Sequence, residues 1–121
     1  MGLGVVERLL ALNYNVAIVD FDEKAGAEVS ARLGPKTLFI KANVIVYEEQ
    51  ADAFAATFAK WHRIDFVYAN AGIGDRIDFF APASSFLENG APVKPDTLVV
   101  DICLNGCIWC VILASLLIDW M

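Results

Sequence analysis

The feature that most constrains this chain is the repeated alternation of amphipathic helical segments with short, apolar, strand-like runs. Residues 3–13 place apolar side chains at helical spacing, and residues 15–20 form a β-branched run typical of a buried strand. Further helices are predicted over 22–33, 47–62 and 96–120, and further strands over 37–42 and 64–69. Strands separated by helices of this length indicate βαβ units and a parallel, doubly wound α/β sheet.

Length and composition agree with such a fold. The 121 residues suffice for a single domain over residues 1–121 but not for two. The hydrophobic fraction of 58% is high for a globular domain, which favours elements buried on both faces. The formal net charge of -6 argues against a nucleic-acid partner, because phosphate binding needs a basic surface.

The three cysteines lie close together near the end of the chain, at Cys103, Cys107 and Cys110. On a helix they would share one face, but no nearby histidine supports a metal site. We therefore predict buried structural cysteines, no bound metal, and a reducing, cytoplasmic compartment. The single histidine, His62, falls at the end of the predicted helix 47–62, where it can meet the last carbonyl groups.

Spacing suggests a site for a dinucleotide. Gly2 and Gly4 open the first helix, where backbone N–H groups can meet a pyrophosphate. Asp20 ends the first strand 18 residues after Gly2, close to the spacing of an acidic residue that binds ribose hydroxyls. An aspartate at the end of a strand is also common where no ligand binds.

A second pattern follows the predicted strand 64–69, in the sequence Val67-Tyr68-Ala69-Asn70-Ala71-Gly72-Ile73. It resembles the NNAG motif of the short-chain dehydrogenase/reductase family, with Ala69 in place of the first asparagine. An ordinary turn built from asparagine and glycine is the competing explanation. Other segments resemble the same family in the same order: Gly2 resembles the last glycine of the TGxxxGIG loop, residues 65–72 resemble IDVLVNNAG, and residues 99–106 resemble VxDxNLxG.

This resemblance covers nearly the whole chain and implies a Rossmann-like oxidoreductase that uses NAD(P) on a secondary alcohol or ketone. NAD is the implied cofactor, because Asp20 is followed by Phe21 and Asp22 rather than by a basic residue. The family pattern also implies adenine contacts from Asn43 and Val44. The full set of expected cofactor-binding residues is Gly2, Leu3, Asp20, Phe21, Asn43, Val44, Asn70, Ala71 and Gly72.

The chain departs from the family pattern in three places. The family's first strand and the TGxxx segment are absent, and Cys103 takes the position of the catalytic asparagine. None of Tyr14, Tyr47 and Tyr68 is followed four residues later by lysine, so no catalytic residue is assigned. We therefore expect a piece truncated at both ends and inactive by itself. In the family's strand order, the absent strand belongs between residues 15–20 and 64–69, which would leave a gap there.

The segment from Ile102 to Ile118 carries no formal charge over 17 residues, the lower limit for crossing a bilayer. Asn105 within it, and the lack of flanking basic residues after it, disfavour a membrane span. In the resembled family this helix is buried and contributes to oligomers, so a homo-oligomer through 96–120 is expected. The alternative function is a non-catalytic nucleotide-binding or interaction fragment.

Overall fold

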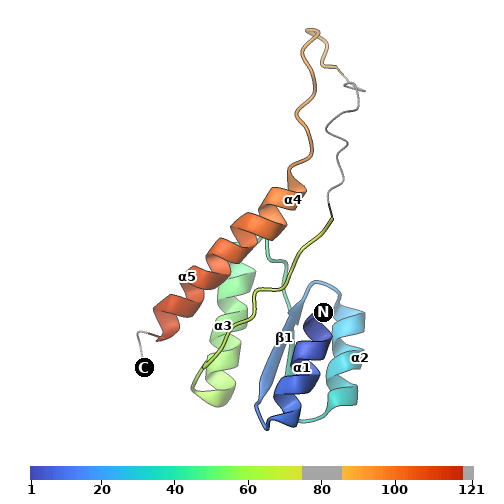
Figure 1. Cartoon of the computed structure of the whole chain (residues 1–121). Coiled ribbons are helices and arrows are strands. Elements are labelled where there is room, and N and C mark those ends of the chain that lie inside the picture. Colours follow the sequence, from blue (N-terminus) through green and yellow to red (C-terminus); the bar gives the residue numbers. More distant parts are fainter. Residues whose placement is uncertain (75–85, 119–121) are drawn as a thin grey trace.

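The predicted α/β fold is confirmed by the computed structural model, which describes residues 1–74 and 86–118 (Figure 1). The elements are α1 (Gly2–Ala11), β1 (Val16–Asp20), α2 (Glu23–Leu33), β2 (Thr37–Lys41), α3 (Tyr47–Trp61), α4 (Leu98–Val100), a π-helix η1 (Asp101–Asn105) and α5 (Gly106–Ile118). Residues 75–85 of the predicted domain and residues 119–120 of the predicted last helix lie outside the described residues.

Strands β1 and β2 form a parallel pair joined by α2, with Val16 opposite Thr37 and Asp20 opposite Lys41. Local signals set the ends of this crossover helix. The Asp22 side chain accepts a hydrogen bond from the backbone N–H of Ala25 (3.0 Å), which caps the start of α2. The helix ends at Gly34, whose φ of 93° suits a residue without a Cβ.

Helix α2 packs on β2 through a glycine that leaves room for an aromatic ring. Gly26 is buried, and a Cβ built on it would lie 1.9 Å from the ring of Phe39. This contact is far below van der Waals distance, so the approach of helix to strand depends on the missing side chain.

The predicted third strand over residues 64–69 is wrong. Among the described residues the sheet contains only β1 and β2, and residues 64–69 form no strand. A strand exists only where a neighbour accepts and donates its backbone hydrogen bonds, and this segment has no such neighbour. It faces β1 across a groove instead, in agreement with the expected gap between residues 15–20 and 64–69.

A buried glutamine on α3 links this helix to the turn before it and to the start of α5. Gln50 on α3 is buried, and its side-chain amide donates to the carbonyl oxygens of Val44 (2.7 Å) and Gly106 (3.0 Å). Gly106 lies against Val44, because a Cβ there would be 3.0 Å from the Val44 carbonyl oxygen. Tyr47 and Trp109 add an edge-to-face contact with ring centroids 6.1 Å apart. These contacts hold α5 against α3, and Figure 1 shows the two helices side by side.

The apolar core is thin. Among residues 1–74 and 86–118, five apolar residues are buried, namely Val16, Ala42, Ala53, Ile64 and Leu113, and no large side chain is fully buried. The chain exposes 8595 Å², whereas a compact protein of its mass exposes roughly 6,400 Å². Apolar side chains that line the groove and α5 account for part of this excess, and include Val19, Phe66 and Ile108.

The predicted burial of the cysteines is wrong for Cys103, which is exposed, while Cys107 and Cys110 are half-buried. The π-helix η1 contains Cys103 and adds a residue to the local turn, which rotates neighbouring side chains away from regular helical positions. His62 caps the end of α3 in the left-handed conformation (φ 55°), in agreement with the prediction that it lies at a helix end.

Because Gly26 packs against Phe39, we expect Gly26→Ala to lower the free energy of unfolding, although glycine to alanine usually raises it in a helix. Glycine to alanine in a helix normally stabilises by about 1 kcal/mol, but Gly26→Ala should destabilise by about 1 kcal/mol or more because Phe39 must move. Urea unfolding followed by circular dichroism measures the difference. Gly4→Ala is the matched control, since nothing lies within 4 Å of its Cβ position. In a Phe39→Ala background, Gly26→Ala should lose its penalty; a penalty that persists there contradicts this packing account.

Candidate functional site

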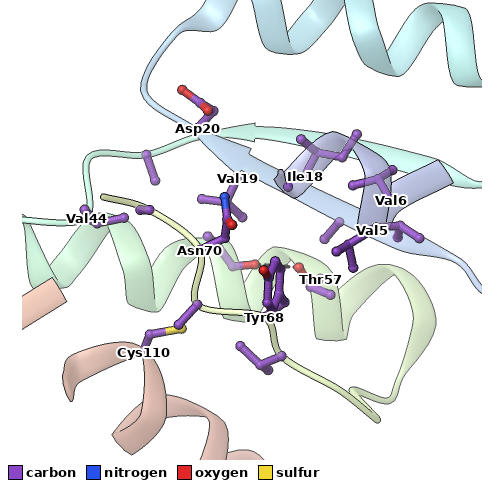
Figure 2. A pocket seen from close by; sticks show the side chains of 18 of the residues that line it. Val5, Val6, Ile18, Val19, Asp20, Val44, Thr57, Tyr68, Asn70 and Cys110 are labelled. Carbon is purple, nitrogen blue, oxygen red and sulfur yellow. Dashed lines mark hydrogen bonds between the residues drawn. The ribbon is translucent and has the colours of Figure 1, made fainter. Parts of the chain in front are cut away.

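A groove of about 960 Å³ lies between β1 and the segment of residues 63–73. Helix α1 lines it with Val5 and Val6, and α3 lines it with residues that include Thr57. Figure 2 shows Asp20 at the end of β1, Asn70 on the facing segment, and Cys110 below it on α5. The groove therefore receives side chains from most elements of the fold.

All of the residues predicted to bind a cofactor border this groove. They are Gly2, Leu3, Asp20, Phe21, Asn43, Val44, Asn70, Ala71 and Gly72. The residues come from four separate stretches of sequence, so their convergence is a property of the fold rather than of neighbouring positions.

The N-terminus of α1 lies at the groove beside Asn70. No side chain caps this helix, so N–H groups of its first turn keep their capacity to donate. Gly2 packs against the Asn70 side chain: a Cβ at Gly2 would lie 2.9 Å from Asn70 Nδ2. Amide donors and the positive end of a helix dipole meet here, which suits an anionic group.

Asp20 presents an exposed carboxylate at the end of β1. Its Oδ1 accepts a hydrogen bond from the backbone N–H of Asp22 at 3.0 Å, which orients the side chain. Because this bond uses Oδ1, Oδ2 can still accept hydrogen bonds from a ligand. Phe21 follows with 74% of its surface exposed and offers an aromatic face at the same end of the groove.

Asn43 and Val44 form the turn that leads from β2 into α3. The Asn43 side-chain oxygen accepts from the backbone N–H of Ile45 (3.2 Å), and the Asn43 N–H donates to Glu49 (2.7 Å). The expected role of this oxygen, accepting from adenine, would use its second lone pair. Val44 is fixed by the Gln50 bond to its carbonyl.

The turn of Asn70, Ala71 and Gly72 is exposed and lies against η1. A Cβ at Gly72 would be 3.5 Å from Cys103 Sγ, and that thiol donates to the Ile73 carbonyl oxygen at 3.6 Å. Cys103 thus contacts the turn at the position where the family pattern has asparagine. A thiol is a weaker donor than an amide, so this contact is a weak one.

Sequence reasoning missed Gln50 and Cys110. Gln50 lies four residues before Phe54, so the two side chains share one face of α3, and this spacing was the signal in the sequence. Cys110 lines the groove, and burial, with a smaller contribution from Cys107, raises the pKa of its thiol. The thiol therefore stays protonated at neutral pH and is a poor nucleophile.

Charged side chains are scarce along the groove. Arg63 and Asp65 pair with each other, with Arg63 Nε 2.9 Å from Asp65 Oδ2. The hydrogen bond from Arg63 lowers the pKa of Asp65, and the same bond raises the pKa of Arg63. Within residues 1–74 and 86–118, no cluster of histidine, cysteine, aspartate and glutamate is arranged to hold a metal ion.

Over the part of the chain that the structure describes, one helical stretch is long and apolar enough to cross a membrane by length and composition alone. It is Leu98–Leu117, with a mean hydropathy of 2.1 and 11% of it buried. Core helices of globular proteins also meet these criteria, so the stretch is weak evidence for a membrane span.

Sequence relatives point to one family. Residues 1–111 match the family described as enoyl-(acyl carrier protein) reductase. A short-chain dehydrogenase/reductase of Penicillium rubens, prx7, is 35% identical over 118 residues, which are 95% of this chain and 42% of the relative. Another from Acremonium egyptiacum, ascJ, is 32% identical and covers 90% of this chain and 35% of the relative. The chain thus spans less than half the length of these relatives.

Solved structures agree on the fold. A short-chain dehydrogenase/reductase from Brucella melitensis superposes with a TM-score of 0.76 at 21% identity, covering 97% of this chain and 48% of that one. Serine dehydrogenase from Escherichia coli gives a TM-score of 0.73 at 17% identity, covering 95% of this chain and 50% of that one. Taken with the match over residues 1–111, these likenesses establish that the chain belongs to the short-chain dehydrogenase/reductase family.

Proposed function

We propose that the groove binds NAD, as the cofactor site of an oxidoreductase of the short-chain dehydrogenase/reductase type. The observation that carries the proposal is the convergence of nine residues from four stretches of sequence on one groove. The uncapped start of α1 at Gly2 suits a pyrophosphate, and Asp20 suits ribose hydroxyls. Bound NAD would supply the hydride acceptor.

A preference for NAD over NADP follows from charge. A 2′-phosphate would meet the exposed Asp20 carboxylate, whereas a 2′-hydroxyl can donate to its Oδ2. None of the nine residues is basic, so no side chain in this set would balance the negative charge of a 2′-phosphate. Phe21 adds an apolar surface beside the carboxylate.

The reaction proposed for the full-length form is hydride transfer between NAD and a secondary alcohol or ketone. The 121 residues contain no tyrosine followed four residues later by lysine, and Cys103 takes the place of the asparagine in the family pattern. Among the groove residues, the Cys110 thiol stays protonated and Asp65 is paired with Arg63. We therefore propose that the chain binds cofactor without turning over substrate.

A second candidate is a non-catalytic nucleotide-binding or interaction fragment. An exposed apolar stripe along the last helices favours it, made of Leu104, Ile108, Val111, Ile112 and Leu116. The spacing of these residues puts them on one face, opposite the side that Gln50 binds through Gly106. The same stripe supports a homo-oligomer, in which two copies would cover each other's apolar surface.

A cytoplasmic location is part of the same proposal. Cys103, Cys107 and Cys110 are all free thiols, as expected for a chain kept in a reducing compartment.

Asp20→Asn tests the cofactor proposal. Asparagine keeps the oxygen that accepts from Asp22 N–H but removes the charge, so the preference for NADH over NADPH should fall about tenfold. Isothermal titration with each nucleotide measures it. Glu28→Gln removes one charge from the exposed face of α2, away from the groove, and should leave the ratio unchanged. Equal ratios for Asp20→Asn and the original chain contradict the assignment of Asp20.

The purified 121-residue chain should not reduce NAD⁺ in the presence of a panel of secondary alcohols. The reason is that it lacks a tyrosine–lysine pair to take the hydroxyl proton. NADH absorbance over time measures turnover, with a full-length short-chain dehydrogenase as the positive control. Turnover that scales with the concentration of this chain would overturn the proposal of an inactive chain while leaving cofactor binding intact.

Self-association should depend on the apolar stripe. Ile108→Glu combined with Val111→Glu places charges on exposed positions, so the fold should persist while dimers are lost. Sedimentation velocity over a concentration series measures the state. Ala55→Glu combined with Ala59→Glu, at exposed positions of α3 outside the stripe, is the control for added charge alone. A chain that is monomeric before any substitution contradicts the oligomer proposal.

A further inference from the structure

A lysine stands beside the Asp20 end of the groove without lining it. β1 ends at Asp20 and β2 ends at Lys41, and the register of the parallel pair puts these two residues opposite each other. Residues paired in this way lie about 4.8 Å apart and direct their side chains to the same face of the sheet. Lys41 is therefore a close basic neighbour of the carboxylate proposed to bind the ribose, although it does not border the groove.

The Lys41 side chain is held by a carboxylate at the start of α2. Its Nζ donates to Glu23 Oε2 at 3.3 Å, and the two side chains are 60% and 70% exposed. Phe39, two residues before Lys41, packs against Gly26, so this face of β2 is the one that α2 covers. Glu23 lies in the first turn of α2, where the helix dipole favours a negative charge. The contact thus draws the Lys41 ammonium toward α2.

Asp20 has a different partner. Its Oδ1 accepts from the backbone N–H of Asp22 at 3.0 Å, and within residues 1–74 and 86–118 no ion pair joins it to Lys41. Lys24 follows Glu23 on α2 but does not share its face, because consecutive helical residues point about 100° apart. Glu23 is therefore the acid that decides where the Lys41 ammonium lies.

We propose that the Glu23–Lys41 ion pair is a second determinant of cofactor choice, because it keeps the Lys41 ammonium away from the 2′ position of the adenosine ribose. This inference rests on the proposed function, which puts that ribose at Asp20. Lysine has a flexible stem, so without Glu23 its ammonium can turn toward a 2′-phosphate and neutralise it. The intact pair thus disfavours NADPH, whereas NADH carries an uncharged 2′-hydroxyl and depends little on the pair.

Glu23→Gln tests the proposal, since glutamine keeps the size of the side chain and removes its charge. NADPH should bind about fivefold more tightly, and NADH affinity should change by less than about twofold, because the freed ammonium attracts only the 2′-phosphate. Isothermal titration with each nucleotide measures both affinities. The gain for NADPH should shrink in about 1 M salt, where the screening length falls to roughly 3 Å.

Lys41→Met separates an effect of the ion pair from simple repulsion by Glu23. In the original chain it should weaken NADPH binding by about twofold or less, because Glu23 already holds the ammonium. Combined with Glu23→Gln, it should remove most of the gain for NADPH. A gain that persists in the double variant overturns the proposal, since Glu23 would then repel the phosphate without any part played by Lys41.

Glu7→Gln and Lys36→Met are the matched controls. Glu7 belongs to another exposed ion pair, with Arg32 at 3.6 Å, and Arg32 lies roughly 13 Å along α2 from Glu23. Lys36 is exposed and precedes the opposite end of β2, roughly 16 Å from Lys41. Neither substitution should alter the ratio of NADH to NADPH affinity.

The same titrations distinguish a failure of this inference from a failure of the proposed function. If the original chain binds NADH and Glu23→Gln leaves the affinity ratio unchanged, the role of the ion pair is overturned and the cofactor proposal stands. If the original chain binds neither nucleotide, both proposals are overturned.

Discussion

The one-sided pairing of β1 is the constraint on which the rest of the structure depends. β1 pairs with β2 along five residue pairs, and this ladder holds α2 against the strands through Gly26 and Phe39. The other edge of β1 has no partner in the described chain, so residues 64–70 lose the neighbour that would make them a strand. The groove, the thin core and the large exposed surface all follow from this.

Gln50 connects this constraint to the candidate site. Its two hydrogen bonds tie the Val44 turn and Gly106 of α5 to α3. Each bond contributes about 1 kcal/mol, and a buried carbonyl left without it would cost more. The bonds fix where α5 begins and so where η1 brings Cys103 against the turn of residues 70–73. The half of the site built from Asn43, Val44 and residues 70–72 therefore rests on one buried amide.

Local signals made most elements predictable from the sequence. The cap at Asp22 and the stop at Gly34 gave the bounds of α2 to within one residue, and periodicity gave α1, α3 and both paired strands. The nine expected cofactor-binding residues are implied by the resemblance to the family pattern, and the fold brings all of them to one groove. Their roles toward a cofactor are a proposal that rests on this convergence.

The features that the sequence did not predict depend on residues far away in the sequence or on an irregular helical turn. Residues 64–69 have strand composition, but pairing is a tertiary event that composition does not decide. The exposure of Cys103 follows from a π-helix, which has no signal in apolar periodicity. Burial of Gln50 depends on two carbonyls, one of them 56 residues away in sequence. A search for polar residues on apolar helix faces would have found it.

Amide hydrogen exchange along β1 of the chain alone tests the central claim most directly. The unpaired edge predicts an alternating pattern of slow and fast amides along β1. The Val16 amide should exchange slowly because it donates to the Lys36 carbonyl, and the amides of Ile18 and Asp20 should exchange slowly because the register directs them to β2. The amides of Ala17 and Val19 should exchange quickly, close to the rate of an unprotected chain. Slow exchange at all five residues would mean that the groove edge is already paired, which would contradict the account.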